Sequence, residues 1–196
     1  MIITEYVVLL LMTIFSFFVG GIPTGYLLAK WYGVSDIRAH GSGNIGASNI
    51  GRVIGWWAFL IVFIIDAAKA ALVIYAAQKI GIANEWLLCV AFAIVLGNCF
   101  SPFLHFNGGK GVATLMGIVG VFCPFILCCA VVVWLIILII TRTPAIASVT
   151  TLFTLSFLSY FFLSFSFIFF FFLSSFIILW RHKKNFQIFE NMRFRL

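Results

Sequence analysis

The sequence predicts an all-α polytopic membrane protein, a bundle of about seven transmembrane helices. Of its 196 residues, 64% are hydrophobic and the mean hydropathy is +1.22. Only 9% are charged, whereas soluble globular domains carry about 25% charged residues. Helices that satisfy their own backbone hydrogen bonds are the usual way for such apolar runs to cross lipid. We expect a single membrane-embedded domain over residues 1–196.

Apolar runs set the expected helices. They cover roughly residues 6–30, 53–78, 86–100, 112–141 and 146–180. Each of the last two exceeds the ~20 residues that one crossing needs. Pro124 and the Phe/Ser-rich stretch near Ser164 are the expected breaks, because proline interrupts a helix. This gives seven spans, with five as the conservative alternative.

Charge asymmetry orients the predicted bundle. With the N-terminus outside, most basic residues share one face, which the positive-inside rule makes cytoplasmic. They are Lys30, Arg38, Arg52, Lys110, Arg142, Arg181, Lys183, Lys184, Arg193 and Arg195. Lys79, Glu5 and Glu85 fall on the opposite face, and five spans would move Arg142 there too. The first apolar run lacks a basic leader and is too long for a typical signal peptide, so none is expected.

The first polar segment, residues 41–52, reads Gly-Ser-Gly-Asn-Ile-Gly-Ala-Ser-Asn-Ile-Gly-Arg. Its glycines let several backbone N–H groups face one anion, and Arg52 adds a cation. We expect a phosphate or oxyanion cradle at the membrane surface. The segment also contains G-x-G-x-x-G, with Asp66 about 20 residues on. A dinucleotide site would need a soluble βαβ unit, whereas membrane spans flank this loop.

Asp66 and Lys69 lie three residues apart within an apolar run, on one helix face. Ionisable groups inside a membrane are costly and often functional. The preferred interpretation is an ion pair that faces the bundle and fixes its packing.

The second polar segment, residues 97–114, includes Gly108-Gly109-Lys110-Gly111 before an apolar helix. Free backbone N–H groups, the positive helix end and an ammonium would together suit a phosphate. It is not a Walker A loop, because Gly111 follows Lys110 where Ser or Thr is required. The alternative is a glycine-rich turn needed only for packing. His105 is left outside the core site.

A third polar segment, Arg181-His182-Lys183-Lys184-Asn185, follows the last span. Taken alone it is typical of a stop-transfer anchor. Because it shares the predicted cytoplasmic face with both glycine loops, the three segments together suggest one site.

Composition excludes other classes of function. No soluble domain presents a basic groove, so nucleic acid is not an expected partner. The cysteines have no C-x-x-C pair and no companion histidines at ligand spacing, so no metal site is expected. We expect them to be small buried hydrophobes: Cys89, Cys99, Cys123, Cys128 and Cys129.

Several ordered motifs resemble the bacterial membrane acyl-phosphate:glycerol-3-phosphate acyltransferase family, and the likeness covers most of the chain. The motifs are Gly21-Ile22-Pro23-Thr24-Gly25-Tyr26-Leu27-Leu28, Asp36-Ile37-Arg38, residues 41–52, Asp66-Ala67-Ala68-Lys69, Ser101-Pro102-Phe103-Leu104, residues 108–114, and Arg181-His182 with Asn185. The resemblance implies a multi-pass inner-membrane enzyme with seven spans and three motif loops on the cytoplasmic side.

By this resemblance, the enzyme acylates the 1-position of glycerol 3-phosphate from acyl phosphate, giving lysophosphatidate and phosphate. This is the first step of phospholipid synthesis and needs no cofactor. Membrane lipid is a further partner, and the enzyme that makes acyl phosphate is a candidate partner.

The resemblance also implies roles for residues. The candidate catalytic residues are Ser42, Arg52, Lys110, His182 and Asn185. The candidate substrate and phosphate ligands are Gly41, Gly43, Asn44, Asn49, Gly108, Gly109, Gly111 and Arg181. Arg52, Lys110 and Arg181 can neutralise phosphate charge. The proton acceptor is either His182 or a phosphate oxygen of a substrate.

The chain departs from the family pattern at a few positions. Asn98 and Asn107 stand where the family usually has histidine and lysine, respectively. Ala145 stands where the family has serine, and Ser148 is a possible substitute for that serine. Ile188 and Phe194 stand where the family has arginine and glutamate, respectively. A weakened homologue is therefore one alternative. A small transporter of an anionic solute is another, although transporters place polar groups at the midplane of repeated halves.

Overall fold

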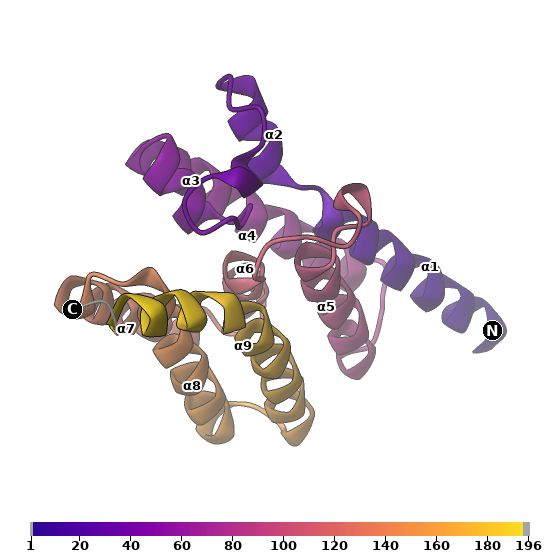
Figure 1. The fold of residues 1–196 in the computed structure, drawn as a ribbon. Helices are drawn as coiled ribbons and strands as arrows, with labels where there is room; N and C mark the ends of the chain where they lie inside the picture. The colour runs from indigo at the N-terminus through magenta and orange to yellow at the C-terminus, as the bar shows by residue number, and fades with distance from the viewer. Residues whose placement is uncertain (1, 194–196) are drawn as a thin grey trace. The chain divides into compact units, whose positions relative to one another are not determined.

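The computed structural model describes the backbone of residues 2–193 and the side chains of residues 3–183. It contains two compact units, Met1–Leu127 and Cys128–Leu196, and each is described by itself (Figure 1). Every regular element within residues 2–193 is helical. This agrees with the predicted fold class and leaves no strand there for a dinucleotide fold. That the chain forms one domain stays a prediction.

The first unit contains most of the elements. They are α1 (Ile2–Gly21), α2 (Thr24–Trp31), η1 (Ile37–Ala39), α3 (Ala47–Val53), α4 (Trp56–Lys79), α5 (Asn84–Cys99), η2 (Pro102–Leu104) and α6 (Val112–Phe122). α7 (Pro124–Thr141) begins at the end of this unit. The second unit continues with α8 (Pro144–Phe162) and α9 (Phe165–Arg193).

Both predicted helix breaks are confirmed. α6 ends at Phe122 and α7 begins at Pro124, while α8 ends at Phe162 and α9 begins at Phe165. Six helical segments are long and apolar enough to cross a membrane, counting α1 and α2 as one. α6, with 11 residues, is shorter. At about 1.5 Å per residue it rises about 16 Å, roughly half of the ~30 Å hydrocarbon layer.

Small residues let the helices of the first unit approach closely. A Cβ at Gly20 would meet the carbonyl oxygen of Ile94, and one at Gly97 would meet that of Phe17, so α1 and α5 are in backbone contact. Gly117 of α6 has the same relation to Ala67 of α4. Such small-residue contacts hold helices together in lipid, where the hydrophobic effect between helices is weak.

The first span is interrupted at Ile22-Pro23, between α1 and α2. Side chains from other elements satisfy the carbonyls at this break. Lys69 Nζ donates to the carbonyl oxygens of Gly20 and Ile22 at 2.9 and 3.0 Å, and Ser101 Oγ donates to that of Gly21. Unpaired backbone groups at membrane depth would cost several kcal/mol each. These bonds therefore stabilise the interruption.

The predicted ion pair between Asp66 and Lys69 is confirmed. Lys69 Nζ lies 2.7 Å from Asp66 Oδ1, and the two side chains are only 11% and 9% exposed for Asp66 and Lys69 respectively. Thr24 Oγ1, at the start of α2, donates to the same carboxylate oxygen at 2.9 Å. The pair on α4 thus holds both sides of the break in the first span.

The residues predicted for the two membrane faces lie toward opposite ends of α4. Lys79 is at its C-terminal end, before the turn 80–83. That turn lines a cavity of about 250 Å³ with Glu5 and Trp86, and the rings of Tyr6 and Trp86 meet edge to face at 6.1 Å. The glycine loops lie at the other end. This placement is compatible with the predicted division of charges, which stays a prediction, as does the end that is cytoplasmic.

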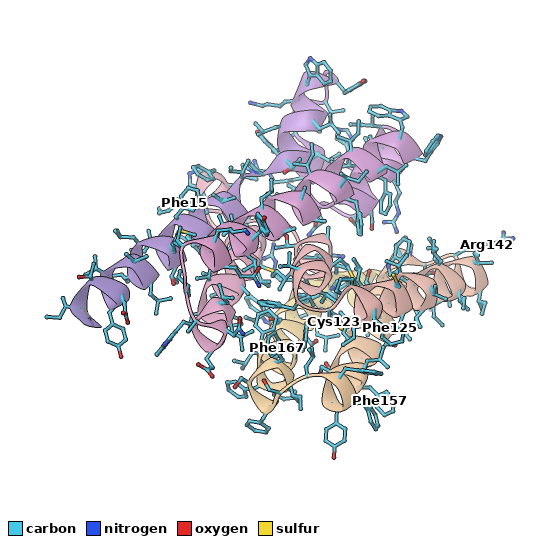
Figure 2. All side chains as sticks on the ribbon, turned by 180° about the vertical axis from the view of Figure 1, so that it is seen from behind. Phe15, Cys123, Phe125, Arg142, Phe157 and Phe167 are labelled. Atoms are coloured by element: carbon cyan, nitrogen blue, oxygen red, sulfur yellow. The ribbon has the colours of Figure 1, made fainter. Side chains whose placement is uncertain are left out.

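In the second unit, the indole N–H of Trp134 on α7 donates to Ser148 Oγ on α8 at 3.2 Å. Bulky apolar side chains cover the outside of the helices. Phe157 on α8 is 64% exposed, and Phe15 on α1 of the first unit is 53% exposed (Figure 2). Exposed phenylalanines at helix positions suit lipid contact.

The cysteine prediction is only partly right. Cys99 is buried, but Cys89 and Cys128 are exposed, and Cys123 and Cys129 are half-buried. The reason is that an apolar side chain in a membrane protein is equally stable against lipid, so apolar surroundings in the sequence do not imply burial in the protein.

Candidate active site

The first glycine loop is built around Asn49, a buried residue of α3. Its Oδ1 accepts the backbone N–H of Ser42 at 2.7 Å, and its Nδ2 donates to the carbonyl oxygen of His40 at 2.9 Å. Gly41 has φ +59°, and a Cβ there would meet Asn49 Oδ1. The side-chain amide of Asn49, expected to contact substrate, is therefore engaged in shaping the loop.

Asn44 has a similar local role. Its Oδ1 accepts the N–H of Gly46 at 2.7 Å, just before α3 begins at Ala47. This turn leads the chain into α3, whose last turn carries Arg52. The Arg52 side chain is exposed and Ser42 is half-buried. Both can reach a ligand from the surface.

A small hydrophobic core lies beneath this loop. It contains Ile37, Ile45 and Ile50 from around the loop, Val62 from α4, and Leu104 from η2 in the second polar segment. The two glycine loops, far apart in sequence, therefore rest on one core.

The second glycine loop folds back along the C-terminal end of α5. The N–H of Gly108 donates to the carbonyl oxygen of Cys99 at 3.2 Å, and that of Gly109 to the carbonyl oxygen of Asn98 at 2.7 Å. The N–H of Gly111 donates to Asn98 Oδ1 at 3.0 Å. These three amides, expected to be free for an anion, are instead paired with α5. Direct binding of phosphate by the glycines stays a prediction.

Close packing explains why glycine is needed here. Gly108 and Gly109 are both buried. A Cβ at Gly108 would meet the backbone of Asn98 and Cys99, and one at Gly109 would lie 2.9 Å from Asn98 Oδ1. Close packing thus gives these glycines a structural role, and whether they also contact substrate stays a prediction. Lys110 lies between Gly109 and Gly111, is half-buried and remains the charged group of this loop.

The two glycine loops meet above the buried ion pair. Gly46 of the first and Gly109 of the second line one small cavity, together with Asp66, Thr24 and Asn98. Its volume is about 10 Å³, enough for about one water molecule. The loops are thus adjacent, and the ion pair supports their junction.

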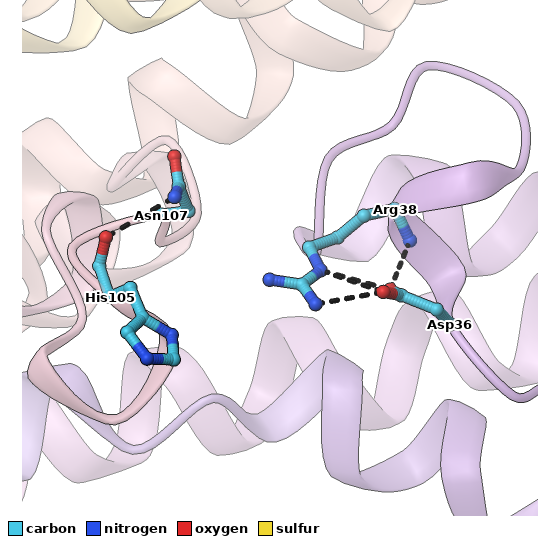
Figure 3. A network of polar contacts seen from close by, with 4 residues as sticks. All are labelled: Asp36, Arg38, His105 and Asn107. Carbon is cyan, nitrogen blue, oxygen red and sulfur yellow. Dashed lines mark hydrogen bonds and ion pairs between the residues drawn. The ribbon is translucent and has the colours of Figure 1, made fainter.

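The outer part of the second loop is strained. His105 and Phe106 have φ values of 51° and 60°, a region that costs non-glycine residues about 1 kcal/mol or more. Asn107 Nδ2 donates to the carbonyl oxygen of His105 at 3.2 Å (Figure 3). All three residues are exposed.

A separate ion pair lies before the first loop. Arg38 Nη2 is 2.8 Å from Asp36 Oδ2 (Figure 3). The side-chain hydrogen bonds from Arg38, followed by its backbone N–H, lower the pKa of Asp36 to about 2. The same contact raises the pKa of Arg38. The Arg38 guanidinium is also 5.5 Å from the ring centre of Tyr26. Its charge is thus committed to this local network.

The third polar segment belongs to the second unit. His182 is buried, and its Nδ1 lies 2.8 Å from the carbonyl oxygen of Ile178. A carbonyl can only accept, so Nδ1 is the donor in this contact. Arg181 is half-buried. The side chains of Lys184 and Asn185, and the departures at Ile188 and Phe194, lie outside the described residues, as do Arg193 and Arg195.

Of the other departures, Ser148 is buried and accepts the hydrogen bond from Trp134. Its hydroxyl therefore has a packing partner, and its role as a substitute for the serine missing at Ala145 stays a prediction. Asn98, noted only as a departure, holds the second loop. The sequence signal for this role is its position next to Gly97 at the end of an apolar run.

Comparison with known proteins shows which family the chain belongs to. Residues 10–191 match the family described as glycerol-3-phosphate acyltransferase. The chain belongs to the glycerol-3-phosphate acyltransferase family. A relative from Thermosynechococcus vestitus is 34% identical over 94% of this chain and 92% of its own length. One from Geobacter sulfurreducens is 45% identical over 56% of each chain. The resemblance in the motifs is thereby confirmed.

Solved structures of this family are also similar. One is described as PlsY, an integral membrane glycerol 3-phosphate acyltransferase, in its glycerol 3-phosphate form. It superposes with a TM-score of 0.88 at 32% identity, over 94% of this chain and 93% of that one. The lysophosphatidic acid form gives a TM-score of 0.85 at 30% identity. These similarities confirm an integral membrane acyltransferase fold.

Proposed function

We propose that this protein transfers a fatty acyl group from acyl phosphate to the 1-hydroxyl of glycerol 3-phosphate. The products are lysophosphatidate and inorganic phosphate. Membership of the glycerol-3-phosphate acyltransferase family supports the acceptor, as do neighbours described in glycerol 3-phosphate and lysophosphatidic acid forms. The motif resemblance supports acyl phosphate as the donor and a cytoplasmic active site in the inner membrane.

The reaction requires little covalent chemistry from the protein. The glycerol hydroxyl oxygen attacks the carbonyl carbon, the bond from that carbon to the phosphate oxygen breaks, and phosphate leaves with the electron pair. Acyl phosphate is an activated mixed anhydride, so no covalent enzyme intermediate is required. The protein has to align two anionic substrates, neutralise their charge and stabilise the oxyanion.

The single observation that carries the proposal is the junction of the two glycine loops. Gly46 and Gly109 line one cavity, and Leu104 joins the core beneath the first loop. Lys110 and Arg52 thus extend from adjacent loops, as a site for phosphate groups requires. Ser42, half-buried in the first loop, is a candidate donor to the oxyanion.

His182 is the candidate proton acceptor. Its Nδ1 donates to the carbonyl of Ile178, which orients the ring, and imidazole is the most frequent general base in enzymes. A phosphate oxygen of a substrate is the alternative acceptor. By resemblance, Arg181 and Asn185 are further candidate residues for the reaction.

The transporter alternative has less support. The Asp66–Lys69 pair is used within the fold, at Thr24 and at the break in the first span. The cavity above it, about 10 Å³, is far smaller than an organic anion.

The test uses purified protein in detergent with palmitoyl phosphate and radiolabelled glycerol 3-phosphate. We expect lysophosphatidate and phosphate in equal amounts, and little product when palmitoyl-CoA replaces palmitoyl phosphate. Equal rates with both donors would overturn the donor assignment. Absence of lysophosphatidate with either donor would overturn the function, or identify a homologue that has lost activity if glycerol 3-phosphate still binds.

A further inference from the structure

The second glycine loop is attached to α5 on both sides of Lys110. Before the lysine, the N–H of Gly109 donates to the backbone carbonyl of Asn98 at 2.7 Å. After it, the N–H of Gly111 donates to the side-chain Oδ1 of the same residue at 3.0 Å. One residue of α5 therefore fixes the backbone immediately before and after the lysine.

Asn98 is itself held in place. It is 8% exposed, near the C-terminal end of α5. Gly97 beside it is in backbone contact with Phe17 of α1. The surroundings thus keep its side chain pointing at the loop. A buried acceptor that pairs with a buried N–H has a much larger effect than a surface hydrogen bond, because losing it leaves the N–H unpaired.

The flanking glycines make this attachment necessary. Gly111 has φ +83°, and a chain rich in glycine has many alternative conformations. Only side-chain or backbone contacts from outside can select one of them. The bond from the Gly111 N–H to Asn98 Oδ1 supplies such a side-chain contact at the point where α6 begins.

From this geometry we propose that Asn98 is the positioning residue for Lys110. Its side-chain oxygen holds the Gly111 N–H, and so directs the lysine ammonium toward the junction of the two glycine loops. The inference rests on the proposed function of Lys110 in acyl transfer. Asn98 acts through the loop and does not itself touch the reacting atoms.

The chemistry predicts which replacements work. Leucine has a similar size but no acceptor, so Asn98→Leu leaves the Gly111 N–H unpaired. Histidine carries Nδ1 at the same number of bonds from Cβ as asparagine Oδ1, and neutral histidine can accept there. Asn98→His should therefore retain most activity. Asn107→Leu is the matched control, because Asn107 is exposed and its side-chain Nδ2 donates to the carbonyl of His105 in the same loop.

The first test measures kcat and KM for lysophosphatidate formation by these variants. We expect Asn98→Leu to lose about 10- to 100-fold in kcat, the range for a misplaced catalytic group. Asn98→His should lose less than about threefold, as should Asn107→Leu. Asn98→Ala, which removes the oxygen without adding volume, replaces Asn98→Leu if the latter is not monodisperse. Equal losses in Asn98→His and Asn98→Leu would overturn the proposal.

A double-mutant cycle separates positioning from general destabilisation. If Asn98 acts through Lys110, adding Asn98→Leu to the Lys110→Ala variant should lower kcat by less than a further factor of about three. If Asn98→Leu lowered kcat by the same factor in Lys110→Ala as in the wild type, the proposal would be overturned.

A second readout does not depend on activity. It measures the rate at which an amine reagent acetylates Lys110, followed by mass spectrometry. This rate should change severalfold in Asn98→Leu, with Lys183 unchanged, and an unchanged Lys110 rate would overturn the positioning role even if the acyl-transfer function failed.

Discussion

Replacing Lys69 with methionine should destabilise the protein strongly. The ammonium makes three contacts, with Asp66 Oδ1 at 2.7 Å and with the carbonyl oxygens of Gly20 and Ile22 at 2.9 and 3.0 Å. Methionine fills nearly the same volume but cannot donate. Lys69→Met therefore leaves a carboxylate that is only 11% exposed without its cation. It also removes the lysine donor from the carbonyls of Gly20 and Ile22, of which the latter keeps the backbone N–H of Thr24 at 3.0 Å.

The magnitude follows from the burial of the pair. Removing one partner of a buried ion pair costs about 3–5 kcal/mol. For a domain of this size, 1 kcal/mol shifts the thermal midpoint by about 2–4 °C. Lys69→Met should thus lower the midpoint by at least about 6 °C. Asp66→Asn should cost less, because the amide oxygen can still accept from Thr24 and Lys69.

The assay is thermal unfolding in detergent micelles, followed by circular dichroism. Lys79→Met is the matched control, because Lys79 ends the same helix in an exposed position with its Nζ 5.2 Å from the ring centre of Tyr75. It should shift the midpoint by less than about 2 °C, as expected for a surface contact. If Lys69→Met shifted the midpoint no more than Lys79→Met, the role of the pair at the break would be refuted.

Two further predictions concern topology and the second glycine loop. Cysteines at Ser42 and Arg142, in a cysteine-free background, should react with an impermeant thiol reagent only from the cytoplasmic side; external labelling at position 142 would favour five spans, and at position 42 would place the loop outside. Gly108→Ala should lower the yield of folded protein, since its methyl meets backbone atoms. The methyl group of Gly109→Ala would lie 2.9 Å from a side-chain oxygen, so this variant should fold. It should raise KM for glycerol 3-phosphate more than KM for acyl phosphate. If both KM values were unchanged, this glycine would have only a packing role.

The helices could be predicted from the sequence because hydrophobic length and proline reflect local physics. Pro124 separates α6 from α7 as expected, and the break before Phe165 follows the Phe/Ser-rich signal. The ion pair of Asp66 and Lys69 was also predictable, since residues three apart share a helix face. Its attachment to the break between α1 and α2 was not, because that contact joins residues more than 40 positions apart.

The sequence indicates candidate site residues but not their contacts. The sequence predicts that the backbone N–H groups of the second loop's glycines bind an anion, yet in the structure they donate to oxygens of Asn98 and Cys99. Periodicity cannot reveal this, because the loop returns along α5 through tertiary contact. Asn49 likewise uses its amide to close the first loop. An exposed Arg52 and a half-buried Lys110 are compatible with the predicted roles.

Acyl transfer by Lys110→Ala and Arg52→Ala tests most directly whether the adjacent glycine loops form a defined phosphate site. Each variant should form lysophosphatidate at least about 100-fold more slowly than the wild type, the scale of roughly 3 kcal/mol for a lost charge-assisted contact. Lys183→Ala, an exposed cation of α9, should retain normal activity. Comparable losses in all three well-folded variants would contradict the account, because general surface charge would then explain the activity.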